Sequence, residues 1–188
     1  MTRRSTKDHR MLSVDEAQEQ MFSRLRVKGV ERVSLLDACG RVLAEDLYAR
    51  WEMPQWDNSA MDGYAVRAAD VKDVPTSLPL SQHIAAGHTA SQALKPGTAA
   101  RIFTGAPMPE GADCVVIQED THDQPDSDEV SFKEKPIVGQ HIRRRGSDKT
   151  TGDHLLAAGR RLSLGDIAVL GSQGRSLVSV IAQASVAI

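Results

Sequence analysis

The segment Pro54-Gln-Trp-Asp-Asn-Ser-Ala-Met-Asp-Gly-Tyr-Ala65 interleaves carboxylates, an amide and a hydroxyl with aromatic and thioether side chains. It shows neither the 3.6-residue period of a helix nor the strict alternation of a strand. Such a segment is typical of a loop held in a fixed shape, and loops of this kind often carry a site. The residues alone leave a packed turn equally open, with Asp57 and Asn58 bonding nearby backbone N–H groups and Gly63 supplying a positive φ.

The composition of the 188-residue chain is that of an ordinary globular protein. Hydrophobic residues make up 40% and charged residues 26%, which suits one or two compact domains with a real core. The formal net charge of −2 argues against a nucleic-acid partner, because nucleic-acid-binding proteins usually carry a basic excess. The sequence has no run of about 18 apolar residues, so we expect no membrane span.

Residues 1–10 are basic and lack the apolar stretch of a secretory signal, and we interpret them as a flexible tail. The two cysteines, Cys39 and Cys114, form no C-x-x-C motif, and both have apolar neighbours in the sequence. The histidines do not fall at the spacings of metal ligands. These features predict a cytoplasmic protein with two free, packed thiols.

A capping box at Ser13 and Glu16 predicts an amphipathic helix over residues 14–28, ended by Gly29. The apolar face of this helix must contact either the core of this chain or a partner helix. A strand that leads into a helical turn is predicted over residues 30–36.

The middle of the chain is β-favouring, and helical character returns after Ile142. Short runs at residues 99–104, 114–118 and 130–132 are separated by proline and glycine, which is the pattern of a small all-β unit. Ser163 predicts a helix over residues 164–173, with Ile167, Ala168 and Leu170 facing inward. A further strand is predicted at residues 177–181.

The segment at residues 54–65 resembles the signature of the molybdopterin molybdenumtransferase family (MoeA and the related domain of gephyrin). Two further blocks agree with that family in the same order. They are Arg101-Ile-Phe-Thr-Gly-Ala-Pro-Met-Pro-Glu-Gly-Ala-Asp-Cys-Val-Val116, and Ile142-Arg-Arg-Arg-Gly-Ser-Asp148. Ser147 is the one departure, because glutamate is frequent there. The similarity runs from about residue 11 to residue 188.

The resemblance implies an α+β, mostly β fold with a discontinuous architecture. A dimerisation domain of helices and strands would comprise residues 11–53 and 141–184, and a small, barrel-like all-β domain would be inserted at residues 54–140. Residues 185–188 would be the truncated first strand of the α/β domain that binds molybdopterin in this family, and we expect the remainder of that domain to be absent.

The resemblance also implies a reaction. The family inserts molybdate into adenylated molybdopterin and releases AMP, with Mg²⁺. It assigns catalytic positions to Asp62, Thr104 and Asp148. Asp62 is also the candidate ligand of Mg²⁺, since this hard cation prefers oxygen ligands.

The candidate cofactor-binding residues are Asn58, Ser59, Gly63, Arg143 and Arg145. Glycine at position 63 would allow backbone to approach a ligand closely. Alternate arginines of the run 143–145 would share one face of a strand and could clamp a phosphate, although a solvated strand edge stays open as the alternative. We interpret the neighbouring Asp57 as structural, tying the loop through Asn58 and Ser59.

Three functions follow as hypotheses. The favoured one is the N-terminal part of a molybdenum insertase, homodimeric through its helical domain, inactive as this fragment, and possessing a molybdopterin adenylyltransferase as a further partner. The second is a non-catalytic, self-associating scaffold of the gephyrin type. The third, a hydrolase using Asp57 and Asp62 as acid and base, is weak because no nucleophile–base pair is visible.

Overall fold

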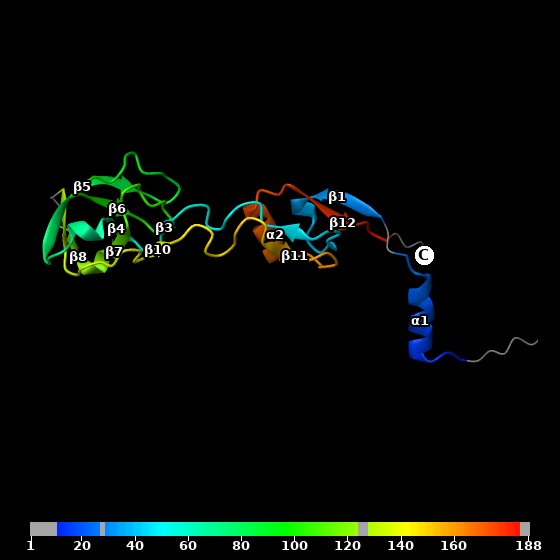
Figure 1. The fold of residues 1–188 in the computed structure, drawn as a ribbon. Coiled ribbons are helices and arrows are strands. Elements are labelled where there is room, and N and C mark those ends of the chain that lie inside the picture. Colours follow the sequence, from blue (N-terminus) through cyan, green and yellow to red (C-terminus); the bar gives the residue numbers. More distant parts are fainter. Residues whose placement is uncertain (1–10, 27–28, 124–127, 185–188) are drawn as a thin grey trace, which may run out of the picture. The chain divides into compact units, whose positions relative to one another are not determined.

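The computed structural model describes residues 11–26, 29–123 and 128–184, and these residues form mostly β-strands with two α-helices (Figure 1). The mostly β character expected from the sequence is thus confirmed. No helix in these ranges is long and apolar enough to cross a membrane.

The chain divides into two compact units, one of Met1–Asp46 with Leu156–Ile188 and one of Leu47–Leu155. The second unit contains the whole of the predicted β domain at residues 54–140. The narrower domain boundaries drawn from the sequence, and the assignment of the first unit to dimerisation, stay predictions. Residues 1–10 and 185–188 lie outside the described residues, so the predicted tail and truncated strand do too.

The unit of residues 47–155 is built on a six-stranded sheet in the order β7-β4-β6-β5-β9-β8. Its strands are β4 (Gly63–Val66), β5 (Thr76–Ile84), β6 (Ala99–Ile102), β7 (Cys114–Ile117), β8 (Thr121–Asp123) and β9 (Glu129–Phe132). All neighbouring pairs are antiparallel except β5 and β6, which are parallel. The strands β6, β7 and β9 confirm the three β-favouring runs recognised in the sequence.

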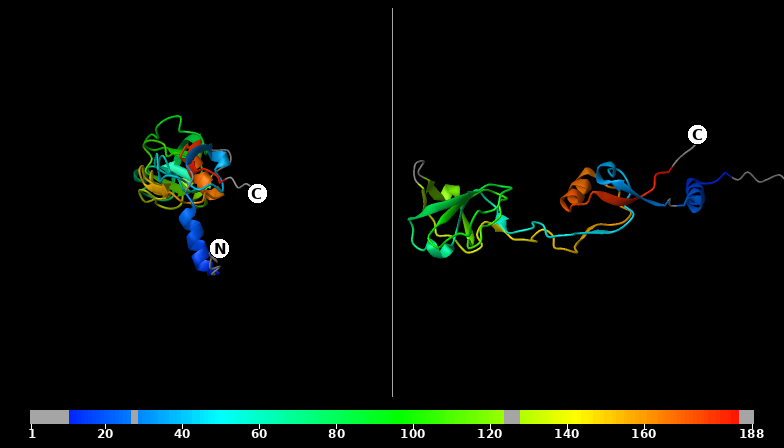
Figure 2. Two further views of the ribbon diagram at one scale, coloured as in Figure 1. Left: turned by 90° about the vertical axis from the view of Figure 1, so that its right-hand side faces the viewer. Right: turned by 90° about the horizontal axis from the view of Figure 1, so that it is seen from above.

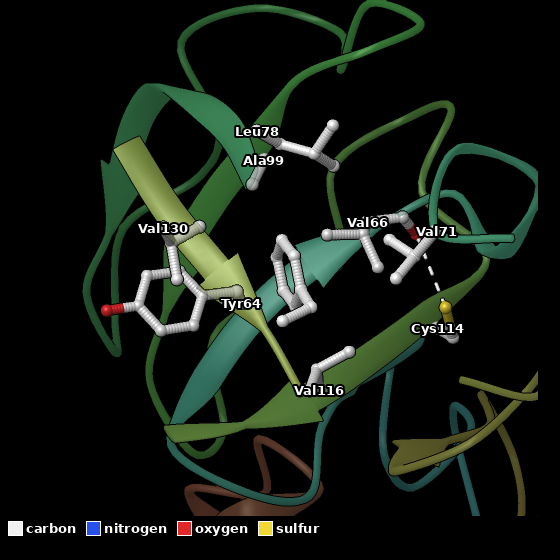
Figure 3. Packing of buried hydrophobic residues seen from close by; sticks show 9 residues of the cluster. Tyr64, Val66, Val71, Leu78, Ala99, Cys114, Val116 and Val130 are labelled. Carbon is white, nitrogen blue, oxygen red and sulfur yellow. Dashed lines mark hydrogen bonds between the residues drawn. The ribbon is translucent and has the colours of Figure 1, made fainter. Parts of the chain in front are cut away.

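Both faces of the central strands are buried. Successive residues of a strand point to opposite faces, and accordingly Tyr64 and Val66 belong to one apolar cluster while Ala65 belongs to another. Figure 3 shows the first cluster, which draws side chains from β4, β5, β6, β7 and β9. Tyr64 packs edge-on against Phe132 there, with ring centroids 6.2 Å apart. This two-sided packing explains why the strands read as continuous apolar runs.

Two short ribbons lead into the sheet. β3 (Asn58–Ser59) pairs antiparallel with β10 (Ile142–Arg143). β2 (Leu47–Tyr48) pairs with β11 (His154–Leu156). An isolated bridge between Met53 and Lys149 lies between these pairs. The first and third sequence blocks therefore run side by side.

The unit formed by the two ends of the chain has its own small sheet. β1 (Val30–Ser34) runs antiparallel to β12 (Leu177–Ile181), and Figures 1 and 2 show these strands side by side. A 3₁₀ turn, Leu35–Asp37, follows β1 as predicted. The helix α2 (Leu164–Ser172) begins at the Ser163 cap and matches the expected span within one residue.

The inward face of α2 differs from the prediction. Leu170 is buried and Ile167 is half-buried, but Ala168 is exposed. Asp166 is buried instead, because its carboxylate accepts hydrogen bonds from the backbone and hydroxyl of Ser163 and from the Arg160 guanidinium. Within the first turn, a polar side chain is thus buried while Leu164 is exposed.

The first helix, α1 (Val14–Arg24), is shorter than predicted. Its capping box at Ser13 and Glu16 is present, but the chain becomes extended at Leu25, four residues before Gly29. No residue of α1 is buried, and its large apolar side chains, such as Phe22 (66% exposed), are open to solvent. We expected the apolar face of this helix to contact either the core of this chain or a partner helix. The first of these contacts is not formed in the structure.

Candidate functional site

Ser59 fastens the first sequence block to the second. Its backbone N–H donates to the Ala106 carbonyl over 3.0 Å, and its own carbonyl accepts from the Gly105 N–H over 2.9 Å. The Ser59 hydroxyl donates to the Met61 carbonyl at 2.5 Å and accepts from the Met61 N–H at 3.3 Å. Because Ser59 is fully buried, its hydroxyl serves the loop that presents the next residues.

Asp62 and Thr104, two of the predicted catalytic residues, are in direct contact although 42 residues separate them. The Asp62 Oδ1 atom accepts from the Thr104 backbone N–H at 2.8 Å and from the Thr104 hydroxyl at 2.7 Å. These two bonds, the backbone one first, lower the pKa of Asp62 below its ordinary value, and the nearby Arg101 charge contributes further. The result is an exposed, ionised carboxylate in a fixed orientation.

Arg101 lies close to Asp62, and the sequence analysis did not select it as a candidate site residue. It pairs with Tyr64 across β6 and β4, and its guanidinium donates to the Gly63 carbonyl and to the Gln118 side chain. Gln118 in turn donates its backbone N–H to the Asp62 carbonyl over 3.1 Å. The only available signal was its place at the head of the second sequence block, because a lone arginine in a strand has no distinguishing pattern.

Gly63 has a structural reason to be glycine. It lies in β4 between β6 and β7 and does not have a positive φ, so the turn geometry considered from the sequence is wrong. A Cβ atom at this position would lie 2.0 Å from the Val116 carbonyl oxygen. Glycine is therefore required because the backbone of the neighbouring strand β7 approaches Gly63 closely, whereas the sequence analysis expected a ligand to do so.

Asp57 is structural, but through different partners from those predicted. Its carboxylate accepts from the Arg145 backbone N–H at 2.8 Å and from the Arg144 guanidinium at 2.6 Å. The first of these bonds is the main cause of the lowered pKa of Asp57. Arg145 also pairs with Glu52 at 3.2 Å. The arginine run therefore secures the loop of the first block rather than standing apart from it.

Asn58 and Arg143 are cross-strand neighbours in the β3–β10 ribbon. Asn58 is only 7% exposed, and its Oδ1 atom has no hydrogen-bond partner among the described residues. An unsatisfied buried acceptor costs about 1–3 kcal/mol, so a donor from solvent or a ligand would be stabilising. Arg143 is exposed and makes no ion pair with any carboxylate in the described part of the chain.

Asp148, the third predicted catalytic residue, lies in the ribbon between β10 and β11. It is exposed, its backbone N–H donates to the Met53 carbonyl, and its carboxylate accepts from the Ser147 hydroxyl at 3.3 Å. Within the described residues the structure records no hydrogen bond that joins Asp148 to Asp62 or Thr104.

A cavity of about 160 Å³ opens next to the Thr104–Gly105 turn. The residues lining it are Trp56, Gly87, His88, Thr89, Gly105 and Pro107. Trp56 is half exposed, so an aromatic side chain forms part of the wall of this cavity.

The residues present do not form a complete metal site. Over residues 11–26, 29–123 and 128–184, no three His, Cys, Asp or Glu side chains gather where they could hold a metal ion. Both recorded hydrogen bonds of the Asp62 carboxylate go to Oδ1, and no side chain or backbone group in the described part of the chain donates to Oδ2. A single carboxylate of this kind fits Mg²⁺ only where a substrate supplies other oxygen ligands, a common arrangement for Mg²⁺ on phosphates.

The comparison with known families now decides the relationship. Residues 12–174 match the family described as the MoeA N-terminal region, domains I and II. The chain belongs to this MoeA family. The match includes all three sequence blocks and both residues of the Asp62–Thr104 pair.

Several MoeA relatives are similar over most of this chain. It is 41% identical over 162 residues to a molybdopterin molybdenumtransferase of Nostoc sp.. The aligned region covers 84% of this chain and 37% of the relative. It is 40% identical over 168 residues to molybdopterin molybdenumtransferase 2 of Mycobacterium tuberculosis, and that alignment covers 86% of this chain and 41% of the relative.

A solved structure agrees with the MoeA assignment. The crystal structure of a molybdopterin biosynthesis moeA protein from Pyrococcus horikoshii superposes with a TM-score of 0.76 at 33% identity, covering 81% of this chain and 41% of that one. The chain thus spans about two fifths of the length of these relatives.

Proposed function

We propose that this chain is the N-terminal part of a molybdenum insertase, which transfers molybdate into adenylated molybdopterin and releases AMP. Its relatives are named molybdopterin molybdenumtransferases, which supports a role in molybdenum cofactor biosynthesis. In this proposal the chain supplies one wall of the reaction cleft and does not catalyse the reaction alone.

The observation that carries the proposal is the Asp62–Thr104 pair. A carboxylate whose first oxygen is bound by two donors has its second oxygen aimed in one direction. Fixed charge of this kind lowers the reorganisation needed when charge develops in a reaction. Asp62 is exposed and contributes to neither of the apolar clusters that pack the two faces of the sheet.

Mg²⁺ would supply charge neutralisation on the substrate phosphates, with Asp62 as its one ligand from this chain. Asn58 would donate or accept at the bound substrate, and Arg143 would contribute positive charge. Asp148 would join the cleft from the neighbouring ribbon. Asp57 is unsuited to the acid–base role of a hydrolase, because both of its oxygens are already bonded.

We also propose that the protein is a cytoplasmic homodimer that receives its substrate from a molybdopterin adenylyltransferase. The exposed Met21 and Phe22 of α1 and the exposed Leu25 that follows it support self-association, because burying such side chains contributes about 1.5–3 kcal/mol each. The same surface favours the second candidate, a scaffold whose only role is assembly. Catalysis at Asp62 separates the two.

The test uses the full-length protein with molybdate-dependent AMP release as the assay. Asp62→Asn should slow release by about 100-fold, the usual cost of removing a fixed electrostatic contact. Thr104→Val should be impaired and Thr104→Ser should retain activity, while Asp15→Asn on α1 is the matched control. Sedimentation should give the same dimer for every variant. Unchanged release in Asp62→Asn, with the dimer intact, would remove Asp62 from the reaction and leave assembly as the role of this chain in the enzyme. A dimeric wild-type protein that releases no AMP would leave the scaffold as the function.

A further inference from the structure

Arg101 is held in one orientation by two aromatic rings. Its guanidinium carbon lies 4.9 Å from the Tyr64 ring centroid and 4.8 Å from the Phe103 ring centroid. Contacts of this kind are attractive and restrict the guanidinium plane. The side chain is thus oriented before any ligand arrives.

The hydrogen bonds of Arg101 go to neutral acceptors. One terminal nitrogen donates to the Gly63 carbonyl at 3.2 Å and the other to the Gln118 Oε1 atom at 2.7 Å. Arg144 and Arg145, in contrast, pair with carboxylates at 2.6 and 3.2 Å. Among the described residues no carboxylate lies within 4.0 Å of the Arg101 guanidinium. A guanidinium has more N–H donors than these two bonds use.

The remaining donors lie close to the proposed reaction cleft. Arg101, Gln118 and Asp62 are joined through the Gln118 side chain and its backbone N–H, and Asp62 is joined to Thr104. The charge of Arg101 acts on the Asp62 carboxylate without a direct ion pair. A positive group thus stands beside the negative one, and each is fixed by separate contacts.

We propose that Arg101 is an oxyanion-binding residue of the cleft, taking a phosphate or molybdate oxygen beside the Asp62–Thr104 pair. The planar guanidinium matches tetrahedral oxyanions through paired N–H donors. Its existing contacts reduce the conformational entropy lost on binding. This inference rests on the proposed function for the identity of the anion, and it shifts the main cationic contact from Arg143 and Arg145 to Arg101.

The test follows the Nε–Hε resonance of Arg101 by NMR in the 188-residue chain. Sodium molybdate and inorganic pyrophosphate are titrated separately, each with and without Mg²⁺, up to about 10 mM, a range suited to affinities near 1 mM. We expect a saturable shift at Arg101 and at the Thr104 amide. Saturation by one anion and not the other identifies whether molybdate or phosphate is the ligand.

Variants sharpen the result. Arg101→Gln should weaken binding about ten- to hundredfold, since a hydrogen bond to a charged group is lost. The matched control is Arg32→Gln, which removes an exposed arginine of β1 that has no role in the proposed site and should bind as the wild type does. No shift at Arg101 with either anion, or equal affinity in Arg101→Gln, would overturn the proposal. If Arg101→Gln fails to fold, the wild-type titration still decides.

Failure of this inference is distinguishable from failure of the proposed function. Normal AMP release with an unchanged KM in full-length Arg101→Gln, alongside inactive Asp62→Asn, would remove Arg101 from the site and keep the insertase. Anion binding at Arg101 in a full-length protein that releases no AMP would keep the site and remove the insertase.

Discussion

Gly63→Ala provides a quantitative test of the strand arrangement that presents Asp62. The added Cβ would lie 2.0 Å from the Val116 carbonyl oxygen and 2.9 Å from the Val116 carbonyl carbon. Real Cβ contacts are not shorter than 3.0 Å, so β4 and β7 must separate by about 1 Å. The obstructing atoms are backbone and cannot rotate away.

Overpacking usually costs about 1–3 kcal/mol, and because the clash is with backbone we expect Gly63→Ala to cost about 3 kcal/mol. The assay is urea unfolding of the 188-residue chain, followed by circular dichroism. Because β4 also supplies the Gly63 carbonyl that binds Arg101, the Arg101 resonance should move as well.

Two glycines serve as controls. Gly29 has an ordinary φ and no atom within 4 Å of a built Cβ, so Gly29→Ala should stay within about 0.5 kcal/mol of the wild type. Gly105 has the same free space but a φ of 84°, so Gly105→Ala should cost about 1–2 kcal/mol from backbone strain alone. A Gly63→Ala variant as stable as Gly29→Ala would refute the pairing of β4 with β7.

Three further predictions concern titration, reactivity and capping. The folded-state pKa of Asp57 lies below its ordinary 3.8, so its stabilising contribution is present above about pH 4 and is lost as the pH falls through the lowered value. Urea unfolding of Asp57→Asn should therefore show a shallower loss of stability below pH 4 than the wild type, and an identical slope would contradict this. Burial raises the pKa of the Cys114 thiol to about 12 whereas Cys39 is exposed, so iodoacetamide at pH 8 should label only Cys39 by mass spectrometry until urea is added. Equal labelling of both thiols in the native protein would disprove the packing of Cys114. Asp166→Ala removes the carboxylate that accepts from the Ser163 backbone N–H in the capping box and that pairs with Arg160. It should lower the free energy of unfolding by about 2 kcal/mol, against little change for Asp15→Ala.

The sequence predicted elements well where local chemistry determines them. The Ser13 and Ser163 caps specify where α1 and α2 begin, since each side chain bonds the N–H three residues ahead. The predicted end of α1 at Gly29 was wrong. This helix buries no residue, so no packing against a core stabilises a further turn after Arg24. The expectation that Cys39 packs among apolar side chains was also wrong, since its thiol is exposed.

Contacts between distant residues could not be derived from the residues alone. Asp57 and Arg144 are 87 positions apart, and the pairing of β3 with β10 and the bridge from Met53 to Lys149 bring their two segments together. Asp62 and Thr104 were both selected through the family resemblance, but their direct bond follows from the register of β4 against β6. Arg101 was missed for the same reason, since its role depends on three neighbours from other segments.

The central claim is that this chain forms part of a molybdenum insertase. Its most direct test is molybdate-dependent AMP release from adenylated molybdopterin, measured for the full-length protein and for the 188-residue chain side by side. We expect turnover by the full-length protein and none by the shorter chain. Absence of molybdate-dependent release from a folded, dimeric full-length protein would contradict it.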